Sequence, residues 1–238
     1  MRGIYSLQIL YLHQYFATPA SNAGTRSYEM AKRFVANGHE VTFITSSAFL
    51  SSAYSLRKGW NLLEINGIKL HVLHLPYSNK DSFVKRIYKF IQFSFSSTLK
   101  SLTLAGDVVL ATSTPLTIAI PGLIYSKLKK IPLVFEVRDL WPELPVAVGA
   151  IKNPFIIKFA RWFEKYTYKN SKRLIGSSPG MCDGMLSTEL IAIKSPLQPT
   201  VVILIYLMFQ RKSGKIISLL NFHFCRVGNW LSIPVRSD

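Results

Sequence analysis

Short runs of β-branched and aromatic residues alternate with amphipathic segments along about the first 180 residues of this 238-residue chain. Such runs are typical of buried parallel strands, and the segments between them have the periodicity of helices with one apolar face. Strands separated by helices predict a mostly parallel, doubly wound α/β sheet. The expected strands cover residues 7–12, 40–45, 62–65, 68–72, 107–111, 133–137 and 173–177, and the expected helices cover residues 25–37, 81–105, 115–130 and 154–170.

Two glycines mark the ends of expected elements. Gly38 follows the apolar face of the first helix and is well placed to end it. Asn66-Gly67 is a strong signal for a type I′ turn, so the runs on either side of it are expected to form a hairpin.

The composition describes a globular chain with a strong excess of positive charge. Hydrophobic residues make up 49% and charged residues 17% of the sequence, which is enough apolar material for a sizeable core. The formal net charge of +17 favours an anionic partner, namely a nucleic acid, an anionic lipid or a phosphorylated substrate. Cys182 and Cys225 provide neither a disulfide framework nor the spacing of a zinc site, and they fit a reducing compartment.

Neither an export signal nor a membrane span is expected. The first seven residues lead directly into a strand-like run and do not resemble a signal peptide. The longest apolar run, residues 201–209, is much shorter than the roughly 18–20 residues that a membrane-spanning helix needs. We therefore expect a cytoplasmic protein, with a peripheral position on the inner face of the plasma membrane as an additional hypothesis.

The chain changes character near Leu190. Residues 1–189 contain 11 Asp and Glu and 23 Lys and Arg, whereas residues 190–238 contain six Lys and Arg and one acid, Asp238. Helix caps, ion pairs and soluble faces normally use acidic side chains. We expect residues 1–189 to form one domain and residues 190–238 to form an irregular basic and apolar tail.

The loop between the first strand and the first helix is a candidate anion site. A loop of small residues before a helix presents backbone N–H groups and the positive helix end to a ligand. Gly24 lets a ligand approach the backbone, and Arg26 adds a cation with bidentate reach. The alternative is an ordinary connection in which Thr25 caps the helix. The Gly-x-Gly-x-x-Gly dinucleotide fingerprint does not occur in this loop.

A second candidate site follows the strand at residues 133–137, because ligands of open α/β sheets bind at the carboxyl ends of strands. Asp139 is able to accept a proton or a sugar hydroxyl, Arg138 is able to pair with a phosphate, and Trp141 is able to stack on a sugar or lipid face. The alternative is structural: Arg138 and Asp139 pair with each other and Trp141 fills the core.

Two further turns have less specific chemistry. Thr112-Ser113-Thr114-Pro115 follows a strand and suits either a ligand contact or a helix cap. Residues 176–180 have the Gly-x-Ser-x-Gly spacing of a nucleophile elbow, but the elbow needs a backbone N–H after the serine. Pro179 has none, so an ordinary βα turn around Ser178 is preferred.

Two expected helices combine apolar residues with cations and few acids. One lies around residues 80–100 and contains Lys85, Arg86 and Lys89; the other lies within residues 152–173, where Glu164 is the one acid beside seven Lys and Arg. Each suits either a core-facing apolar stripe with a solvated basic face, or an interfacial helix on anionic lipid.

Five motifs occur in an order that resembles a known family. They are His13-Gln14-Tyr15-Phe16 with Gly24-Thr25-Arg26, Gly38-His39-Glu40-Val41, Thr112-Ser113-Thr114-Pro115, Arg138-Asp139-Leu140-Trp141-Pro142, and Ser178-Pro179-Gly180-Met181. Together they resemble the N-terminal half of family 4 glycosyltransferases. Within that family, the type they resemble is the WbuB-like sugar transferases of bacterial O-antigen and capsule assembly. The resemblance covers about residues 5–188.

The resemblance implies the N-terminal half of a GT-B fold, in which two Rossmann-like domains face a cleft. In the family, the N-terminal domain binds the acceptor, typically a polyprenyl-diphosphate-linked glycan, and the C-terminal domain binds the nucleotide sugar. Gly24 matches the family's glycine loop near the donor diphosphate. Asp139 matches the aspartate after the strand, and Arg138 stands where many relatives have histidine.

On this basis Asp139 and Arg138 are the candidate catalytic residues for hexosyl or N-acetylhexosaminyl transfer. The candidate substrate-binding residues are His13, Gly24, Thr25, Arg26, Thr112 and Trp141. The nucleotide sugar is expected as a substrate, with no separate cofactor and no metal.

The family's donor-binding Glu-x7-Glu motif has no counterpart here, because no glutamate follows Glu189. We therefore expect a truncated chain that is inactive alone and whose tail replaces the donor-binding domain. A shift of reading frame near residue 190 would explain the missing carboxylates.

Two other classes of function are weighed against this one. The high positive charge suits a basic nucleic-acid-binding α/β protein, but the cations accompany apolar helices rather than a nucleic-acid-reading motif, so no nucleic acid partner is expected. A nicotinamide-dependent oxidoreductase is disfavoured because its glycine fingerprint does not occur.

Overall fold

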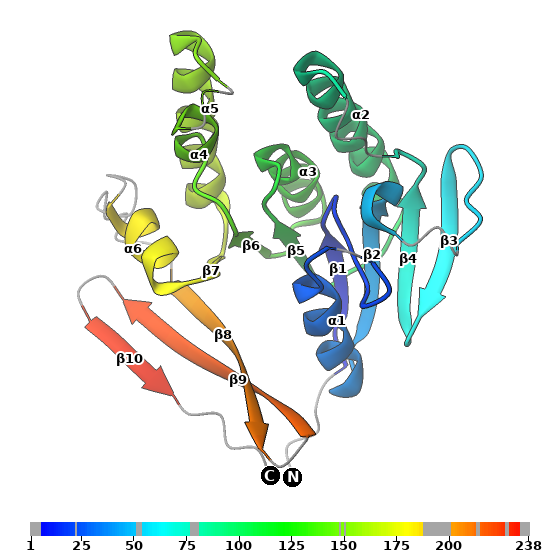
Figure 1. Cartoon of the computed structure of the whole chain (residues 1–238), viewed down its shortest axis with the longest axis vertical. Helices are drawn as coiled ribbons and strands as arrows, with labels where there is room; N and C mark the ends of the chain where they lie inside the picture. The colour runs from blue at the N-terminus through cyan, green and yellow to red at the C-terminus, as the bar shows by residue number, and fades with distance from the viewer. Residues whose placement is uncertain are drawn as a thin grey trace. The chain divides into compact units, whose positions relative to one another are not determined.

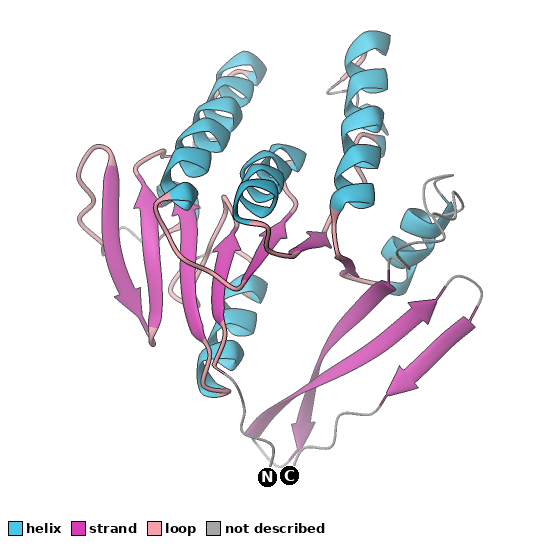
Figure 2. Ribbon diagram, turned by 180° about the vertical axis from the view of Figure 1, so that it is seen from behind, coloured by secondary structure: helices cyan, strands magenta, loops and turns pink. Residues whose placement is uncertain are grey.

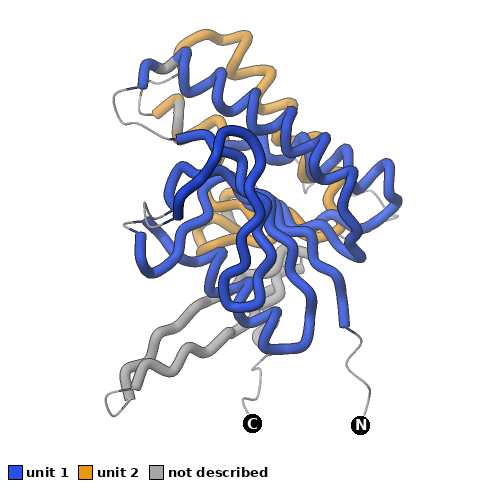
Figure 3. The backbone as a smooth tube through the Cα atoms, turned by 90° about the vertical axis from the view of Figure 1, so that its right-hand side faces the viewer, with its two compact units in different colours: residues 1–133 blue, residues 134–238 orange. Residues whose placement is uncertain are grey.

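The computed structural model describes residues 6–21, 23–50, 54–76, 81–147, 149, 151–187, 201–212, 215–226 and 229–233, the last three ranges by their backbone. The chain divides into two compact units, residues 1–133 and residues 134–238 (Figure 3).

The first unit is built on a mainly parallel sheet with the strand order β5-β1-β2-β4-β3 (Figure 1). Strands β5, β1, β2 and β4 run parallel to one another, and β3 is an edge strand paired antiparallel with β4. Their bounds are β1 (Gln8–Leu12), β2 (Glu40–Ser46), β3 (Trp60–Ile65), β4 (Ile68–Leu73) and β5 (Val108–Thr112).

Helices cover both faces of this sheet. Helix α1 (Arg26–Ala36) lies in front of the sheet in Figure 1, whereas α2 (Phe83–Leu102) and α3 (Ala119–Lys129) lie in front of it in Figure 2, which is seen from behind. Because both faces are covered, β1 is buried from Ile9 to Leu12 without alternation. Phe43 of β2 contacts Tyr11 and Phe16 with ring centroids 4.3 Å and 4.6 Å away, at the centre of this core. The predicted doubly wound α/β arrangement is confirmed.

The two glycine signals also act as predicted. Gly38 adopts a φ of +83°, and Gly38 and His39 donate their backbone N–H groups to the carbonyls of Val35 and Phe34, which closes α1 with a Schellman motif. Asn66 and Gly67 have φ values of +50° and +75° and join β3 to β4 in a hairpin.

The helix predicted over residues 115–130 begins later than expected. A short 3-10 segment, η2 (Leu116–Ile118), precedes α3, whose first residue is Ala119. Pro121 therefore lies in the first turn of α3. A backbone N–H there has no intrahelical acceptor, so the proline removes no hydrogen bond and no kink is required.

The second unit contains most of β6 (Leu133–Val137), with β7 (Arg173–Gly176) paired parallel to it. Its helices are α4 (Glu143–Ala147), α5 (Pro154–Asn170) and α6 (Pro179–Ser187). Asn153 caps α5 by accepting the N–H groups of Phe155 and Ile156, and Pro154 occupies the first helical position, where proline is favoured.

The C-terminal region differs from the irregular tail that the sequence led us to expect. Its backbone forms three strands, β8 (Val201–Lys212) parallel to β7, followed by β9 (Lys215–Arg226) and β10 (Asn229–Ile233) in antiparallel order. The physical reason is the high β-propensity of the apolar, β-branched and aromatic runs, which pair with one another. Residues 190–200 of the expected tail lie outside the described residues.

Candidate functional site

His13 and Thr112 meet at the carboxyl ends of β1 and β5. Leu12 pairs with Ala111, so the next residues, His13 and Thr112, occupy equivalent positions on adjacent parallel strands. Both side chains are buried. The Nδ1 atom of His13 lies 3.0 Å from the Ser27 hydroxyl on α1, and the Thr112 hydroxyl donates to the Tyr11 hydroxyl at 3.2 Å. Two predicted site residues are thus brought together on rigid elements.

The loop after β1 is fastened to the end of β2. The Gln14 carbonyl accepts hydrogen bonds from the hydroxyls of Ser46 at 2.6 Å and Thr45 at 3.2 Å. The Phe16 backbone N–H donates to the Thr45 hydroxyl, and the Phe16 side chain is fully buried. The first part of this loop is therefore a fixed, buried wall.

The later part of the loop leads to the N-terminus of α1. Gly24 is exposed, and Thr25 and Arg26 are half-buried. Thr25 stands at the N-cap position, and its carbonyl accepts the Glu29 N–H at 2.9 Å, but its side chain makes no capping hydrogen bond with the described residues. Thr25 therefore occupies the cap position of that alternative, without a side-chain capping hydrogen bond.

Arg138, Asp139 and Trp141 follow β6 in the second unit, and all three side chains are half-buried. Half-burial contradicts the alternative in which Trp141 fills the core. Helix α6 contacts this loop through Gly184, because the side chain of Leu140 packs directly on the glycine. A Cβ atom at residue 184 would lie only 2.6 Å from Cδ1 of Leu140. The loop thus has a defined position relative to α6.

The second unit also buries two carboxyl groups that the sequence did not single out. Glu136 lies in β6, just before the candidate loop, and is fully buried. Glu164 is buried on the inner face of α5, where Tyr168 donates a hydrogen bond to it at 2.7 Å. Burial raises the pKa of Glu164 to about 7, although the Tyr168 hydrogen bond opposes this shift, and burial beside Glu164 raises the pKa of Tyr168.

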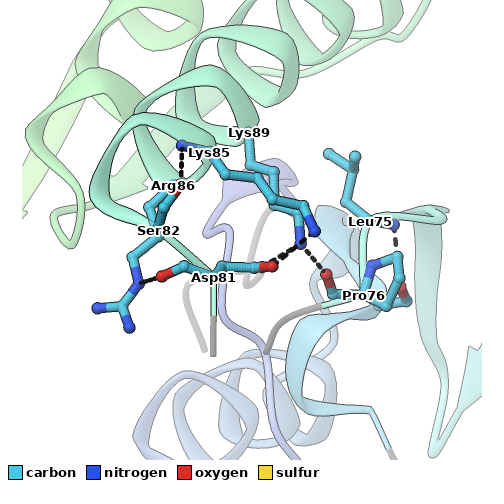
Figure 4. A network of polar contacts seen from close by, with 8 residues as sticks. Leu75, Pro76, Asp81, Ser82, Lys85, Arg86 and Lys89 are labelled. Carbon is cyan, nitrogen blue, oxygen red and sulfur yellow. Dashed lines mark hydrogen bonds and ion pairs between the residues drawn. The ribbon is translucent and has the colours of Figure 1, made fainter. Parts of the chain in front are cut away.

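A basic network surrounds the start of α2 in the first unit (Figure 4). Asp81 pairs with Lys85 at 2.8 Å and with Lys89 at 2.5 Å, and these two hydrogen bonds lower the pKa of Asp81 to about 2. Lys89 also donates to the Pro76 carbonyl at 2.6 Å. The pair of Asp81 and Lys85 has the i,i+4 spacing that a sequence can show, whereas the hydrogen bond from Lys89 to the Pro76 carbonyl spans 13 residues and has no local signal.

The outer faces of α2 and α5 are apolar. On α2, the large side chains of Val84, Tyr88, Ile91, Phe95 and Leu99 are all more than half exposed, whereas Ser94, Ser97 and Ser101 face inward. On α5, Phe155, Phe159 and Trp162 are exposed on the face opposite buried Glu164 and Tyr168. The alternative in which the apolar stripe faces the core therefore does not describe these exposed side chains, although Phe93 of α2 is fully buried. No helix among the described residues is long and apolar enough to cross a membrane.

Ser178 acts as a helix cap. Its hydroxyl accepts the Met181 N–H at 3.2 Å and its carbonyl accepts the Cys182 N–H at 3.1 Å, which starts α6. This is the βα turn that was preferred over a nucleophile elbow. Across the part of the chain that the structure describes, no group of three or more His, Cys, Asp and Glu side chains is placed to hold a metal ion.

Parallel strands joined by helices, with polar side chains at their carboxyl ends, define a Rossmann-like α/β protein. The chain belongs to the family described as the Glycosyl transferase 4-like domain, whose model matches residues 23–189, more than half of the sequence. The resemblance to family 4 glycosyltransferases is thereby confirmed at the level of the family.

Solved structures with similar folds have low sequence identity. Sucrose-phosphate synthase from Thermosynechococcus elongatus is 13% identical with a TM-score of 0.52, over 82% of this chain and 47% of that chain. The α,α-trehalose 6-phosphate synthase of Burkholderia multivorans is 7% identical with a TM-score of 0.47, over 89% of this chain and 46% of that chain. MurG of Acinetobacter baumannii is 13% identical with a TM-score of 0.37, over 73% of this chain and 42% of that chain.

The likeness to the sucrose-phosphate synthase supports the Rossmann-like fold alone, because the identity is low. The chain spans about half the length of these three proteins. Among the curated proteins, none matches this sequence.

Proposed function

We propose that this chain is the acceptor-binding part of a glycosyltransferase that moves a sugar from a nucleotide-sugar donor to a lipid-linked or glycan acceptor in surface polysaccharide biosynthesis. The observation that carries the proposal is the family match over residues 23–189. That range contains the candidate residues Arg26, Thr112, Arg138 and Asp139. These follow parallel strands or begin a helix, where α/β proteins bind their ligands.

Each candidate residue has a role in this proposal. Asp139 orients the acceptor hydroxyl or accepts its proton, and Arg138 pairs with a phosphate group. Trp141 stacks on a sugar ring. In the complete reaction, the acceptor hydroxyl attacks the anomeric carbon of a hexosyl or N-acetylhexosaminyl donor while the leaving diphosphate is stabilised electrostatically.

Five other candidates define the substrate contacts. Gly24, Thr25 and Arg26 surround the start of α1, where an anionic diphosphate is favoured by the backbone N–H groups and the helix dipole. His13 and Thr112 form the buried support between β1 and β5. We propose that His13 and Thr112 help to position the acceptor.

We propose in addition that the protein acts on the anionic inner face of the plasma membrane, where a polyprenyl-diphosphate-linked glycan is presented. Support comes from the outward apolar faces of α2 and α5 and from the net charge of +17. Aromatic and aliphatic side chains flanked by cations are the pattern of helices that lie in the interface of an anionic bilayer. The same exposed apolar faces argue against a nucleic acid as the partner, since they have no role in binding phosphates.

A separate proposal concerns residues 190–238. The family match ends at residue 189, where the stretch without carboxylates begins. We propose that this segment replaces a donor-binding domain through a change of reading frame, which would leave the chain inactive alone. The gene sequence downstream, read in all three frames, tests this: an alternative frame should encode Glu-x7-Glu, and its absence would refute the idea.

Acceptor binding is the direct test of the proposed function. Nanodiscs that contain undecaprenyl-diphosphate-linked N-acetylglucosamine should bind the purified chain, and Asp139→Asn and Arg138→Gln should weaken that binding by about tenfold or more, the loss of roughly 1.4 kcal/mol. Lys32→Gln, an exposed change on α1 away from the candidate residues, should bind as the wild type does. Equal binding to nanodiscs without the acceptor would refute acceptor recognition.

Turnover is measured in the same samples with labelled nucleotide sugars. The chain alone should release no labelled glycolipid. Sustained sugar transfer would contradict the proposal that the chain is inactive alone, but it would agree with the proposed glycosyltransferase function.

A further inference from the structure

The loop that contains the candidate residues Arg138, Asp139 and Trp141 joins two elements that both contact α5. It leaves β6 after Val137 and ends at Glu143, the first residue of α4. Helix α5 follows α4 and leads to β7, which is parallel to β6, so α5 runs antiparallel to β6. The N-terminal part of α5 therefore lies toward the end of β6 at which the loop begins.

The β6 end of the loop lies near a buried pair of side chains on α5. The rings of Phe135 in β6 and Tyr168 in α5 have their centroids 6.3 Å apart. Glu164 is 2% exposed and accepts a hydrogen bond from Tyr168 at 2.7 Å. One helical turn rises about 5.4 Å and two strand residues rise about 6.6 Å, so Glu164 lies about level with Val137, where the loop starts. Glu136, beside Phe135, points to the opposite face of the sheet, because successive strand residues alternate.

The α4 end of the loop is attached to α5 by an ion pair. Oε1 of Glu143 lies 3.7 Å from Nε of Arg161, and both side chains are about half exposed. Arg161 precedes Glu164 by three residues, a spacing at which two side chains of a helix are neighbours. Arg161 therefore interacts with two carboxyl groups, Glu143 of α4 and Glu164 of its own helix.

The charges that act on Glu164 come from α4 and α5. Burial and the Glu143 carboxylate raise the pKa of Glu164 to about 7. The hydrogen bond from Tyr168 and the positive charges of Lys165 and Arg161 oppose this shift. Along α5, Glu164 lies between Tyr168 and Arg161, the two residues that contact the elements at either end of the loop. A change of charge at Glu164 near neutral pH therefore occurs between the two attachments.

We propose that α5 positions the candidate loop: Arg161 holds its α4 end through Glu143, and the protonation state of Glu164 sets how firmly. With Glu164 protonated, Arg161 pairs with Glu143 and the loop is attached to α5 at both ends. With Glu164 ionised, the new negative charge repels Glu143 and competes for Arg161, so the α4 end is released. An exposed ion pair is weak, so one added charge nearby is enough to change how often it forms.

Arg161 and Glu164 act on the loop through Glu143 and are therefore positioning residues. That the loop contacts substrate rests on the proposed function, whereas its attachment to α5 does not.

Fluorine NMR of the full chain labelled with fluorotryptophan tests the proposal, because Trp141 lies within the loop. The variant Trp141→Phe identifies its signal among those of the four tryptophans. In the wild type this signal should shift as the pH is raised from 5 to 9, with a midpoint near pH 7. Trp60, in β3 of the first unit, is the internal reference, and its signal should keep its position.

Three variants have distinct expected results. Glu164→Gln should keep the Trp141 signal at its low-pH position throughout, because no charge develops. Arg161→Gln should place the signal at the released position already at low pH and should remove the titration, whereas Arg161→Lys keeps a cation and should restore it. Tyr168→Phe should move the midpoint to higher pH, because the hydrogen bond from Tyr168 favours the ionised carboxylate.

The matched control is Lys158→Gln, which removes another exposed cation of α5 and should titrate as the wild type does. No titration of the wild-type Trp141 signal would overturn the proposal. The same titration in Arg161→Gln as in the wild type would also overturn it, because Trp141 would then sense the charge of Glu164 without any release of the loop. If Glu164→Gln does not fold, Arg161→Gln and Tyr168→Phe still decide the question.

The measurement contains no substrate, so its outcome is separate from that of the acceptor-binding test. Nanodiscs that bind without any titration of Trp141 would overturn the role of α5 alone. A titration that disappears in Arg161→Gln, together with nanodiscs that do not bind, would refute the proposed function and leave the role of α5 in place.

Discussion

Ser94 and Phe95 are consecutive residues of α2, and the small polar residue is the one that faces inward. Ser94 is 2% exposed and donates its hydroxyl to the Thr117 carbonyl at 3.0 Å, whereas Phe95 is 66% exposed. The pattern continues along the helix, since Ser97 and Ser101 are buried while Ile91 and Leu99 are exposed. This helix contacts its own unit through Phe93 and several serines, and it leaves a row of large apolar side chains exposed for a partner.

Substitutions at neighbouring positions of α2 should therefore have opposite effects. Phe95→Ser should leave the free energy of unfolding within about 0.5 kcal/mol of wild type, because the ring is exposed. It should weaken binding to phosphatidylglycerol vesicles, because the bilayer loses an aromatic contact. Phe93→Ala should cost about 3–5 kcal/mol of stability, because Phe93 is fully buried. Urea unfolding and vesicle co-sedimentation measure both, and unchanged vesicle binding in Phe95→Ser would argue against membrane docking by this face.

The cations of α5 should contribute to membrane binding through electrostatics. Lys158 and Lys165 are both exposed on α5. Replacing both by Gln should reduce affinity for anionic vesicles by about 2 kcal/mol, roughly 30-fold, since each basic residue near such a surface contributes on the order of 1 kcal/mol. Binding to phosphatidylcholine vesicles should not change. Tighter binding of the wild type to duplex DNA than to anionic vesicles at the same salt concentration would favour the nucleic-acid alternative.

Glu164 should make stability depend on pH. Burial raises its folded-state pKa from the usual 4.5 to about 7, so between these values the folded protein holds a proton that the unfolded chain has released. The stabilisation is complete below about pH 4.5 and is lost as the pH rises through 7, with a slope of up to about 1.4 kcal/mol per pH unit. Glu164→Gln keeps an acceptor for Tyr168 and should remove this slope. Urea unfolding from pH 5 to 8 measures it, with Glu64→Gln, an exposed carboxyl on β3 of the first unit, as the control.

Two glycines of α6 should respond differently to alanine. Gly184→Ala places a methyl group against Leu140 and should destabilise the unit by about 1–3 kcal/mol while displacing the loop that contains Arg138 and Asp139. Gly180→Ala meets no atom within 4 Å and should be neutral or slightly stabilising, because alanine favours the helix. Chemical denaturation of the two variants provides the comparison. Equal effects would show that the contact between Gly184 and Leu140 does not hold the loop.

Much of the local structure follows from the sequence. The bounds of β6 and α5, residues 133–137 and 154–170, agree with the prediction because a short β-branched run and a proline-initiated amphipathic segment are local signals. Asn66-Gly67 specifies its turn through its own backbone preferences. The positions of His13 and Thr112 at strand ends were likewise readable from strand patterns.

Other features depended on contacts between distant segments. The Gln14 carbonyl accepts hydrogen bonds from Thr45 and Ser46, which lie 31 and 32 residues further along the chain, and no local pattern indicates this contact. The pKa of Glu164 is raised because α5 places this side chain on its buried face. The helical periodicity of the sequence indicates that α2 and α5 have apolar stripes. It does not indicate whether the rest of the protein buries those stripes or leaves them exposed.

Up to β7, the sequence by itself determined the order of strands and helices and the turn at Asn66-Gly67, because these depend on interactions within short stretches of chain. Its five motifs also indicated the family. The tertiary structure alone decided that Phe95 faces outward while Ser94 is buried, and that the Gln14 carbonyl is fixed by Ser46 and Thr45. Which side of a helix becomes its inner face depends on the shape and volume of what it packs against, and that surface exists only once the strands and helices have assembled.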